Sequence, residues 1–121
     1  MQHLYEISPL YMRGGTAIGS GGTINCTGVD WTAYEGGALV VANVGATPTG
    51  TLIYKLCGGT ASGDVANVFA SGTVLPGAGG TLVGTITGTV TTQFANVQLI
   101  STGGTVLASA ELIGKKRFLT V

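Results

Sequence analysis

Charged side chains are scarce in this sequence. They make up 8% of its 121 residues, whereas an ordinary soluble domain has roughly 25%. A free monomer normally needs surface charge to stay soluble, so the composition favours a protein that works inside an assembly, with a rigid secreted β-domain as the alternative. The formal net charge is zero. We therefore expect no electrostatic attraction to nucleic acid or to an anionic membrane.

Long apolar runs are also missing. The longest nonpolar stretch, residues 38–44, is far shorter than the ~20 residues that a membrane-spanning helix needs. Residues 1–6 contain no basic segment followed by an apolar one, so we expect no secretory signal and synthesis in a cytoplasm. The length fits one domain around one core.

Residues that carry catalysis are few and scattered. His3 is the only histidine, and it lies in a segment without expected fixed structure, so no Ser-His-Asp or Cys-His system can be assembled around it. Metal ligation fails on the number and the spacing of ligands. Asp30 and Glu35 are close in sequence, but we expect no sugar cleft around them beyond Trp31 and Tyr34. The sequence therefore predicts no enzyme activity, no metal and no cofactor.

Cysteine is represented by Cys26 and Cys57 alone. Two residues without CxxC spacing are too few for a metal site. Free cysteines commonly behave as small buried apolar residues, which is the interpretation we prefer here. A cross-strand disulfide is the alternative.

Short runs of alternating apolar and polar residues are abundant, and no helical period is found. Glycine contributes 22 residues, and Gly-Thr pairs recur without a fixed spacing, as they would at junctions between turns and strands. The runs that we predict as strands are residues 23–29, 38–44, 51–57, 65–70, 73–75, 81–90, 94–100, 105–113 and 117–121. Turns are predicted at residues 45–50, 58–64, 76–80 and 101–104, the last resembling a hairpin turn.

This pattern predicts an all-β protein, a single β-sandwich or jelly roll of about eight short antiparallel strands with Greek-key crossings. Residues 1–22 are expected to form an extended N-terminal arm with a glycine-rich lead-in, and residues 23–121 the sandwich. Residues 38–44 are almost all apolar, which predicts a strand that is central in its sheet or buried on both faces. Gly84 and Gly88 share the apolar face of their strand, where they would let another strand or a subunit approach closely.

The N-terminal arm is a candidate interface. It carries the apolar residues Tyr5, Ile7, Leu10 and Tyr11, while Pro9 blocks a continuous helix. An apolar arm that cannot form a core alone must lie on another surface. That surface is either its own sandwich or a neighbouring subunit.

Two further groups could contact another protein. Trp31 and Tyr34 flank an expected bend; they either cover one end of the core or act as a hot-spot pair at an interface. Lys115, Lys116 and Arg117 hold three of the five basic residues. They form either a solvated turn or a docking surface for an acidic partner.

A Val-Asp-x-x-x-Tyr-Glu segment precedes an apolar strand that ends in Val-Gly-Ala, and a basic segment follows near the end of the chain. The residues concerned are Val29, Asp30, Tyr34, Glu35, Val41, Asn43, Val44, Gly45 and Ala46, with Lys116, Arg117 and Phe118. In this order, and in the arm that precedes it, the sequence resembles the small jelly-roll capsid decoration (cement) proteins of tailed bacteriophages. The likeness covers residues 28–121.

The resemblance implies a structural virion protein that binds the outer surface of a phage head and stabilises contacts between capsomers. Its partners would be the major capsid protein and further copies of itself, as a dimer or a trimer. It would be located on the capsid surface. The alternatives are another structural virion component, such as a tail or head-completion protein, and a carbohydrate- or receptor-binding β-module.

Overall fold

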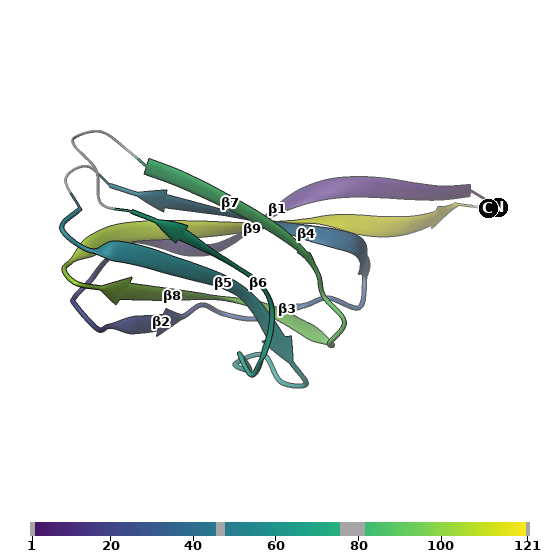
Figure 1. Ribbon diagram of the computed structural model, residues 1–121. Helices are drawn as coiled ribbons and strands as arrows, with labels where there is room; N and C mark the ends of the chain where they lie inside the picture. The colour runs from purple at the N-terminus through teal and green to yellow at the C-terminus, as the bar shows by residue number, and fades with distance from the viewer. Residues whose placement is uncertain (1, 46–47, 76–81, 121) are drawn as a thin grey trace.

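Two antiparallel sheets pack face to face in the computed structural model, and the described residues contain no helix (Figure 1). The structure describes residues 2–45, 48–75 and 82–120, with side chains described between residues 17 and 115 apart from 35, 36 and 82. The strands are β1 (Gln2–Ile18), β2 (Thr23–Asn25), β3 (Val29–Asp30), β4 (Tyr34–Val44), β5 (Thr51–Gly59), β6 (Asn67–Val74), β7 (Leu82–Thr89), β8 (Phe94–Thr102) and β9 (Val106–Thr120).

The sheet order is that of a jelly roll. Sheet A has the order β1-β9-β4-β7, and sheet B has the order β2-β8-β5-β6, with β3 also paired to β8. Apart from β2–β3 and β5–β6, successive strands lie in different sheets, as Greek-key crossings require. The predicted all-β fold class and the crossings are confirmed. The predicted central position of residues 38–44 is confirmed as well, because β4 lies between β9 and β7.

The core lies between the two sheets and follows the two-residue period of the strands. On β4, Ala38, Val40, Ala42 and Val44 are buried, while the residues between them are half-buried on the outer face. Sheet B contributes further buried aliphatic side chains, including Leu52. Each such Val or Leu side chain stabilises the fold by about 1.5–3 kcal/mol relative to an exposed one.

Hydrogen-bonded pairing between neighbouring strands of a sheet changes several of the strand boundaries that the local sequence predicts. The runs predicted at 65–70 and 73–75 contribute to one strand, β6 (Asn67–Val74), because Gly72 continues the ladder opposite Tyr54. Residues 105–113 and 117–121 were predicted as separate strands, but β9 runs unbroken from Val106 to Thr120. In contrast, residues 23–29 are divided between β2 and β3. Residues 46 and 47 of the turn predicted at 45–50, and the whole of the turn predicted at 76–80, lie outside the described residues.

The hairpin predicted at residues 101–104 is wrong, because β8 and β9 belong to different sheets. Gly103 has φ +73°, a conformation that glycine adopts without strain. The Ser101 hydroxyl donates a hydrogen bond of 2.6 Å to the Gly104 carbonyl. These two features turn the chain from one sheet to the other.

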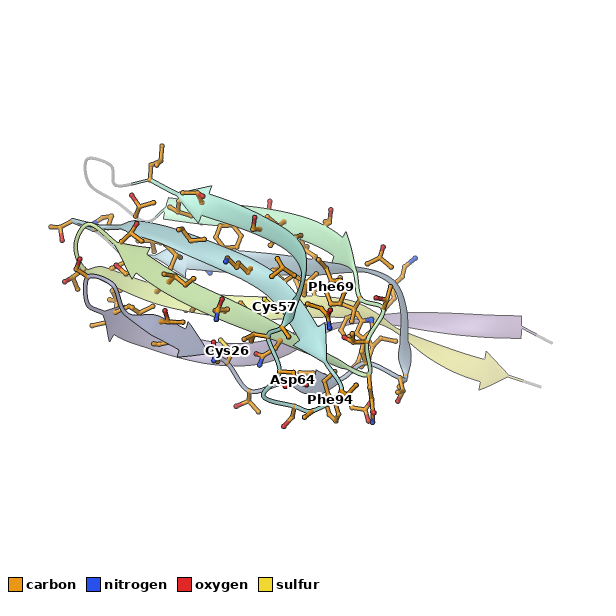
Figure 2. The ribbon with its side chains drawn as sticks, turned by 60° about the horizontal axis from the view of Figure 1, so that its bottom comes forward. Cys26, Cys57, Asp64, Phe69 and Phe94 are labelled. Atoms are coloured by element: carbon orange, nitrogen blue, oxygen red, sulfur yellow. The ribbon has the colours of Figure 1, made fainter. Side chains whose placement is uncertain are left out.

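The two cysteines are buried, form no disulfide and lie on either side of β8 (Figure 2). Cys26 donates its backbone N–H to Val97 and belongs to the core, whereas Cys57 pairs with Asn96. Burial raises the pKa of the Cys57 thiol. The interpretation as small buried residues is therefore confirmed, and the alternative disulfide is absent.

A loop after β5 covers this part of sheet B. Asn96 is fully buried and donates its side-chain amide to the Ser62 carbonyl at 3.3 Å. The Asp64 carboxylate accepts hydrogen bonds from the backbone N–H groups of Thr60 and Ala61, both at 3.1 Å. The turn predicted at 58–64 is shorter than expected, because β5 extends to Gly59.

Glycines on β6 and β7 make room for Tyr54. The Tyr54 ring is 3% exposed, and burial raises the pKa of its hydroxyl. A Cβ added at Gly84 would lie 2.5 Å from the Tyr54 Oη, and one at Gly72 would lie 2.6 Å from its Cζ. At Gly88 the nearest atom is a Leu56 methyl at 3.1 Å. The predicted core-facing position of Gly84 and Gly88 is confirmed, and it is the opposite sheet that approaches them.

Replacement of Gly84 by alanine should destabilise the fold. The new methyl group would overlap with the Tyr54 hydroxyl, and such overpacking typically costs about 1–3 kcal/mol. Gly63→Ala is the matched control, because nothing lies within 4 Å of its added Cβ; its effect should stay within about 0.5 kcal/mol. Urea unfolding of both variants tests the packing, and equal stabilities would contradict it.

Candidate functional site

The two ends of the described chain pair with each other. Every residue of β1 from Gln2 to Tyr11 has a partner on β9, beginning with Gln2 opposite Thr120 and ending with Tyr11 opposite Glu111. We call these paired segments, residues 2–11 and 111–120, the terminal ribbon. In Figure 1 the ribbon leaves the sandwich at the end where both termini lie. Because β4 accompanies β9 only as far as Lys116, residues 2–5 and 117–120 form a two-stranded tip.

The terminal ribbon unites candidate residues from distant parts of the sequence. Their backbone positions face each other in register, although the structure does not describe most of their side chains. The facing pairs are Tyr5 with Arg117, Ile7 with Lys115, Tyr34 with Lys116, Leu10 with Leu112 and Tyr11 with Glu111. The sequence left two surfaces possible for the arm, its own sandwich or a neighbouring subunit. In the structure the arm pairs with β9 of its own chain.

The basic segment is part of a strand, so the predicted turn is wrong. Pairing supplies the reason: β9 continues because β1 and β4 offer partners to its backbone. The register places Glu6 opposite Lys116 and Glu35 opposite Lys115. Facing positions of opposite charge favour strand pairing. Docking of the segment onto an acidic partner stays a prediction.

Trp31 lies inside the molecule, beneath β9. It is 4% exposed, and its ring stacks on Tyr34 with centroids 4.7 Å apart and planes 19° from parallel. Its backbone N–H donates to Gln93 at 2.7 Å, and its indole Nε1 has no hydrogen-bond partner among the described residues. A Cβ on Gly114 would collide with the Trp31 ring. Trp31 thus covers one end of the core, and its role at an interface stays a prediction.

Asp30 shapes the turn that leads from β3 into β4. Its Oδ1 accepts hydrogen bonds from the backbone N–H of Thr32 at 3.0 Å and from the Thr32 hydroxyl at 2.8 Å. The hydrogen bond from the Thr32 backbone, followed in effect by the one from its hydroxyl, lowers the pKa of the Asp30 carboxyl. The Tyr34 N–H then donates to the Trp31 carbonyl at 3.0 Å. This arrangement fixes the point at which β4 joins β9.

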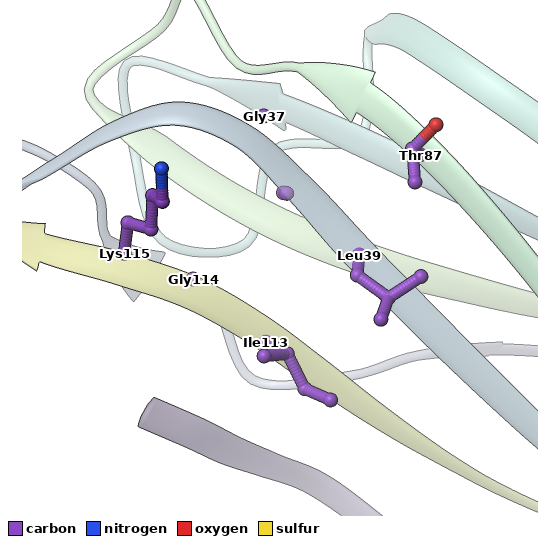
Figure 3. Close-up of a pocket in the computed structure, with 7 residues that line it drawn as sticks. Gly37, Leu39, Thr87, Ile113, Gly114 and Lys115 are labelled. Carbon is purple, nitrogen blue, oxygen red and sulfur yellow. The ribbon is translucent and has the colours of Figure 1, made fainter. Parts of the chain in front are cut away.

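A bulge of three residues in β4 opens a groove beside the base of the terminal ribbon. Glu35 pairs with Lys115 and Leu39 pairs with Ile113, so residues 36–38 face Gly114 alone. The groove has a volume of about 300 Å³. Figure 3 shows its lining, with Leu39, Ile113 and Lys115 as its larger side chains. The full lining is Gly37, Ala38, Leu39, Thr87, Ile113, Gly114 and Lys115.

The outer face of sheet A is apolar around this groove. Leu39, Val41 and Ile113 are half-buried at outward positions near the groove, whereas Val83 and Leu107, which are 59% and 51% exposed, lie toward the other end of the sheet. A solvated antiparallel sheet usually carries polar residues on its outer face. Sequence reasoning missed Leu39 and Ile113 as site residues. The signal was present in residues 38–44, where the polar positions of an alternating strand are occupied by apolar side chains.

Two common kinds of functional feature are absent from the described residues. They contain no group of three or more His, Cys, Asp or Glu side chains that could hold a metal ion. No helix among them is long and apolar enough to cross a membrane. Neither finding assigns a function.

Comparison with known proteins defines the fold. No known protein family matches the sequence, and no curated protein is similar to it. The structure is similar to the CBM36-1 domain of a multidomain xylanase from the hindgut metagenome of Trinervitermes trinervoides, with a TM-score of 0.57 and 11% identity over 96% of this chain and 100% of that one. It is also similar to the C-terminal CBM6 of LamC from Zobellia galactanivorans, with a TM-score of 0.53 and 17% identity over 92% and 98%.

A protein of the disulfide-linked pili that form Bacillus endospore appendages aligns as well, with a TM-score of 0.49 and 11% identity over 99% of this chain and 93% of that one. The chain therefore has a β-sandwich, jelly-roll fold that it shares with the two carbohydrate-binding modules. At these identities the likeness extends to the fold alone.

Replacement of Gly114 by alanine should disturb the base of the terminal ribbon. The added methyl group would displace the Trp31 ring, at a cost of about 1–3 kcal/mol. Because Trp31 is the only tryptophan, its fluorescence reports this site directly, and its emission should shift to longer wavelength as water gains access. Gly19→Ala serves as the control, since nothing lies within 4 Å of its added Cβ. Unchanged emission and stability in Gly114→Ala would contradict the packing.

Proposed function

We propose that this protein is a non-enzymatic structural subunit that joins a larger protein assembly through its terminal ribbon and the adjacent groove. The observation that carries the proposal is the ribbon itself. A two-stranded ribbon is marginally stable in water without further packing, and here the tip extends beyond β4. A partner surface would supply the missing contacts.

The groove supports the same assignment. Its apolar lining, with Leu39 and Ile113, lies next to the basic segment of β9. Interfaces commonly place one apolar side chain of a partner in such a pocket, with polar residues at the rim. The low charge of the whole chain, 8% of residues, is consistent with a surface that stays covered.

In its specific form, the proposal is capsid decoration. The resemblance around Asp30, Tyr34 and Glu35, stated above from the sequence, is what supports a phage virion as the assembly. The major capsid protein would then be the partner, and the outer surface of the head the location. Binding to the assembled shell and not to its free subunits would stabilise the shell by mass action.

Shortening the ribbon tip should weaken attachment to phage heads. A chain without residues 1–5 and a Leu39→Ser variant should each bind heads assembled from the capsid protein of the same genome at least ~10-fold more weakly, a loss of about 1.4 kcal/mol. Leu75→Ser is the control, because Leu75 is 69% exposed and follows β6, away from the ribbon. Cosedimentation measures occupancy. Equal occupancy of all variants would exclude the ribbon and the groove as the docking site.

A carbohydrate- or receptor-binding module is the second candidate, favoured by the fold shared with two carbohydrate-binding modules. Sugar recognition commonly uses an accessible aromatic face. Among the side chains whose burial the structure describes, no aromatic ring is fully exposed: Trp31 and Tyr54 are buried, and Tyr34, Phe69 and Phe94 are half-buried. This observation ranks the candidate second.

A glycan array separates the two candidates. The structural proposal predicts no reproducible binding by the purified chain. Binding that is lost in Tyr34→Ala or Phe94→Ala, with an unchanged unfolding midpoint, would instead establish the carbohydrate-binding candidate. Trp31→Ala is a poor variant for this purpose, because Trp31 belongs to the core and its removal typically costs about 3–5 kcal/mol.

A further inference from the structure

The sheet edges of this fold are unequal. β6 and β7 lie side by side and close one flank of the sandwich. β2 and β3 are only 3 and 2 residues long, which is one way in which proteins protect an edge. β1 has 17 residues and pairs with β9 alone among the described strands. It therefore presents a long unpaired edge.

The usual protection is weak over the outer half of β1. Register shifts that twist the edge lie between Tyr11 and Thr16, whereas the register from Gln2 to Tyr11 is regular. That regular segment spans about 30 Å at ~3.4 Å per residue. Pro9 removes one backbone donor from it, as is common on edge strands. The remaining backbone groups on the outer side have no partner strand in the described chain.

We infer that this edge pairs with the same edge of a second copy of the chain, so that two β1 strands run antiparallel across a two-fold axis. The inference deepens the proposed function and rests on it, since it names the first partner of the terminal ribbon. Two copies of sheet A would form one continuous sheet of order β7-β4-β9-β1-β1-β9-β4-β7. Such an interface is closed, and both long edges are satisfied at once.

Charge favours a second copy over a foreign strand. Glu6 of β1 occupies the position opposite Lys116, and Glu35 of β4 occupies the position opposite Lys115. These two basic positions of β9 thus already face acidic positions of their own chain, so the ribbon does not require an acidic strand as its partner. The formal net charge of the whole chain is zero, so two copies meet without long-range repulsion. The pairing also converts each two-stranded tip into part of a four-stranded ribbon, which is a more stable arrangement.

Amide hydrogen exchange of the intact, purified chain tests the pairing, alongside native mass spectrometry. Successive residues of an antiparallel strand direct their N–H groups to opposite sides. In a monomer, every second amide from Gln2 to Tyr11 is open to solvent. In the proposed dimer both sets are protected, so the outward set should exchange at least ~10-fold more slowly as concentration rises and the dimer forms. A monomer at all concentrations, or a dimer whose outward set stays fast, would overturn the inference.

Adjacent proline substitutions add a second readout. Of Ile7→Pro and Ser8→Pro, one removes an N–H directed to β9 and the other removes an N–H directed to the free edge. The substitution that removes the N–H directed to the free edge should abolish the dimer and leave the Trp31 emission unchanged. Retention of the dimer by both variants would refute edge pairing. If the chain is monomeric but still decorates heads, only this inference fails; if it dimerises but leaves heads bare, only the capsid assignment fails.

Discussion

The antiparallel pairing of β1 with β9 is the interaction on which the rest of the structure depends. It joins the two ends of the described chain and completes sheet A. At its inner end, Ile18 faces Val106, and both side chains are buried in the core. At its outer end the same ladder leaves the sandwich as the terminal ribbon. One set of backbone hydrogen bonds thus links core stability to the surface that we propose for docking.

The point at which the ribbon leaves the sandwich is set by packing around Gly114. A side chain at this position would overlap with Trp31. Because glycine has none, the rings of Trp31 and Tyr34 can stack directly beneath β9. The bulge formed by residues 36–38 lets β4 pass this cluster before it resumes pairing at Leu39. The groove is a consequence of that bulge. Core packing and the docking surface are therefore two sides of one local arrangement.

Alternation of apolar and polar residues was sufficient to predict the sandwich, the central position of β4 and the core-facing glycines of β7. It was insufficient where pairing overrides local preference. Pro9 indicates irregular structure, yet β1 runs through it opposite Ile113, while the glycines at 14 and 15 fall in a register shift after which β1 resumes pairing with β9 at Thr16. Gly114 and the basic residues after it indicate a turn, yet β9 continues. The candidate residues of the arm and of the basic segment could be identified one by one from the sequence. Their pairing with each other could not be predicted, since the register between distant segments is a tertiary property.

Electron cryomicroscopy of the native assembly that contains this protein is the most direct test of the claim that the terminal ribbon makes the contacts. The account predicts that residues 2–11 and 111–120 lie at the junctions between subunits, with the outer edge of β1 beside another strand. The opposite end of the sandwich, where Leu75, Val83 and Leu107 are exposed, should face away from those junctions. A ribbon surrounded by solvent, with contacts made by that opposite end, would contradict the account.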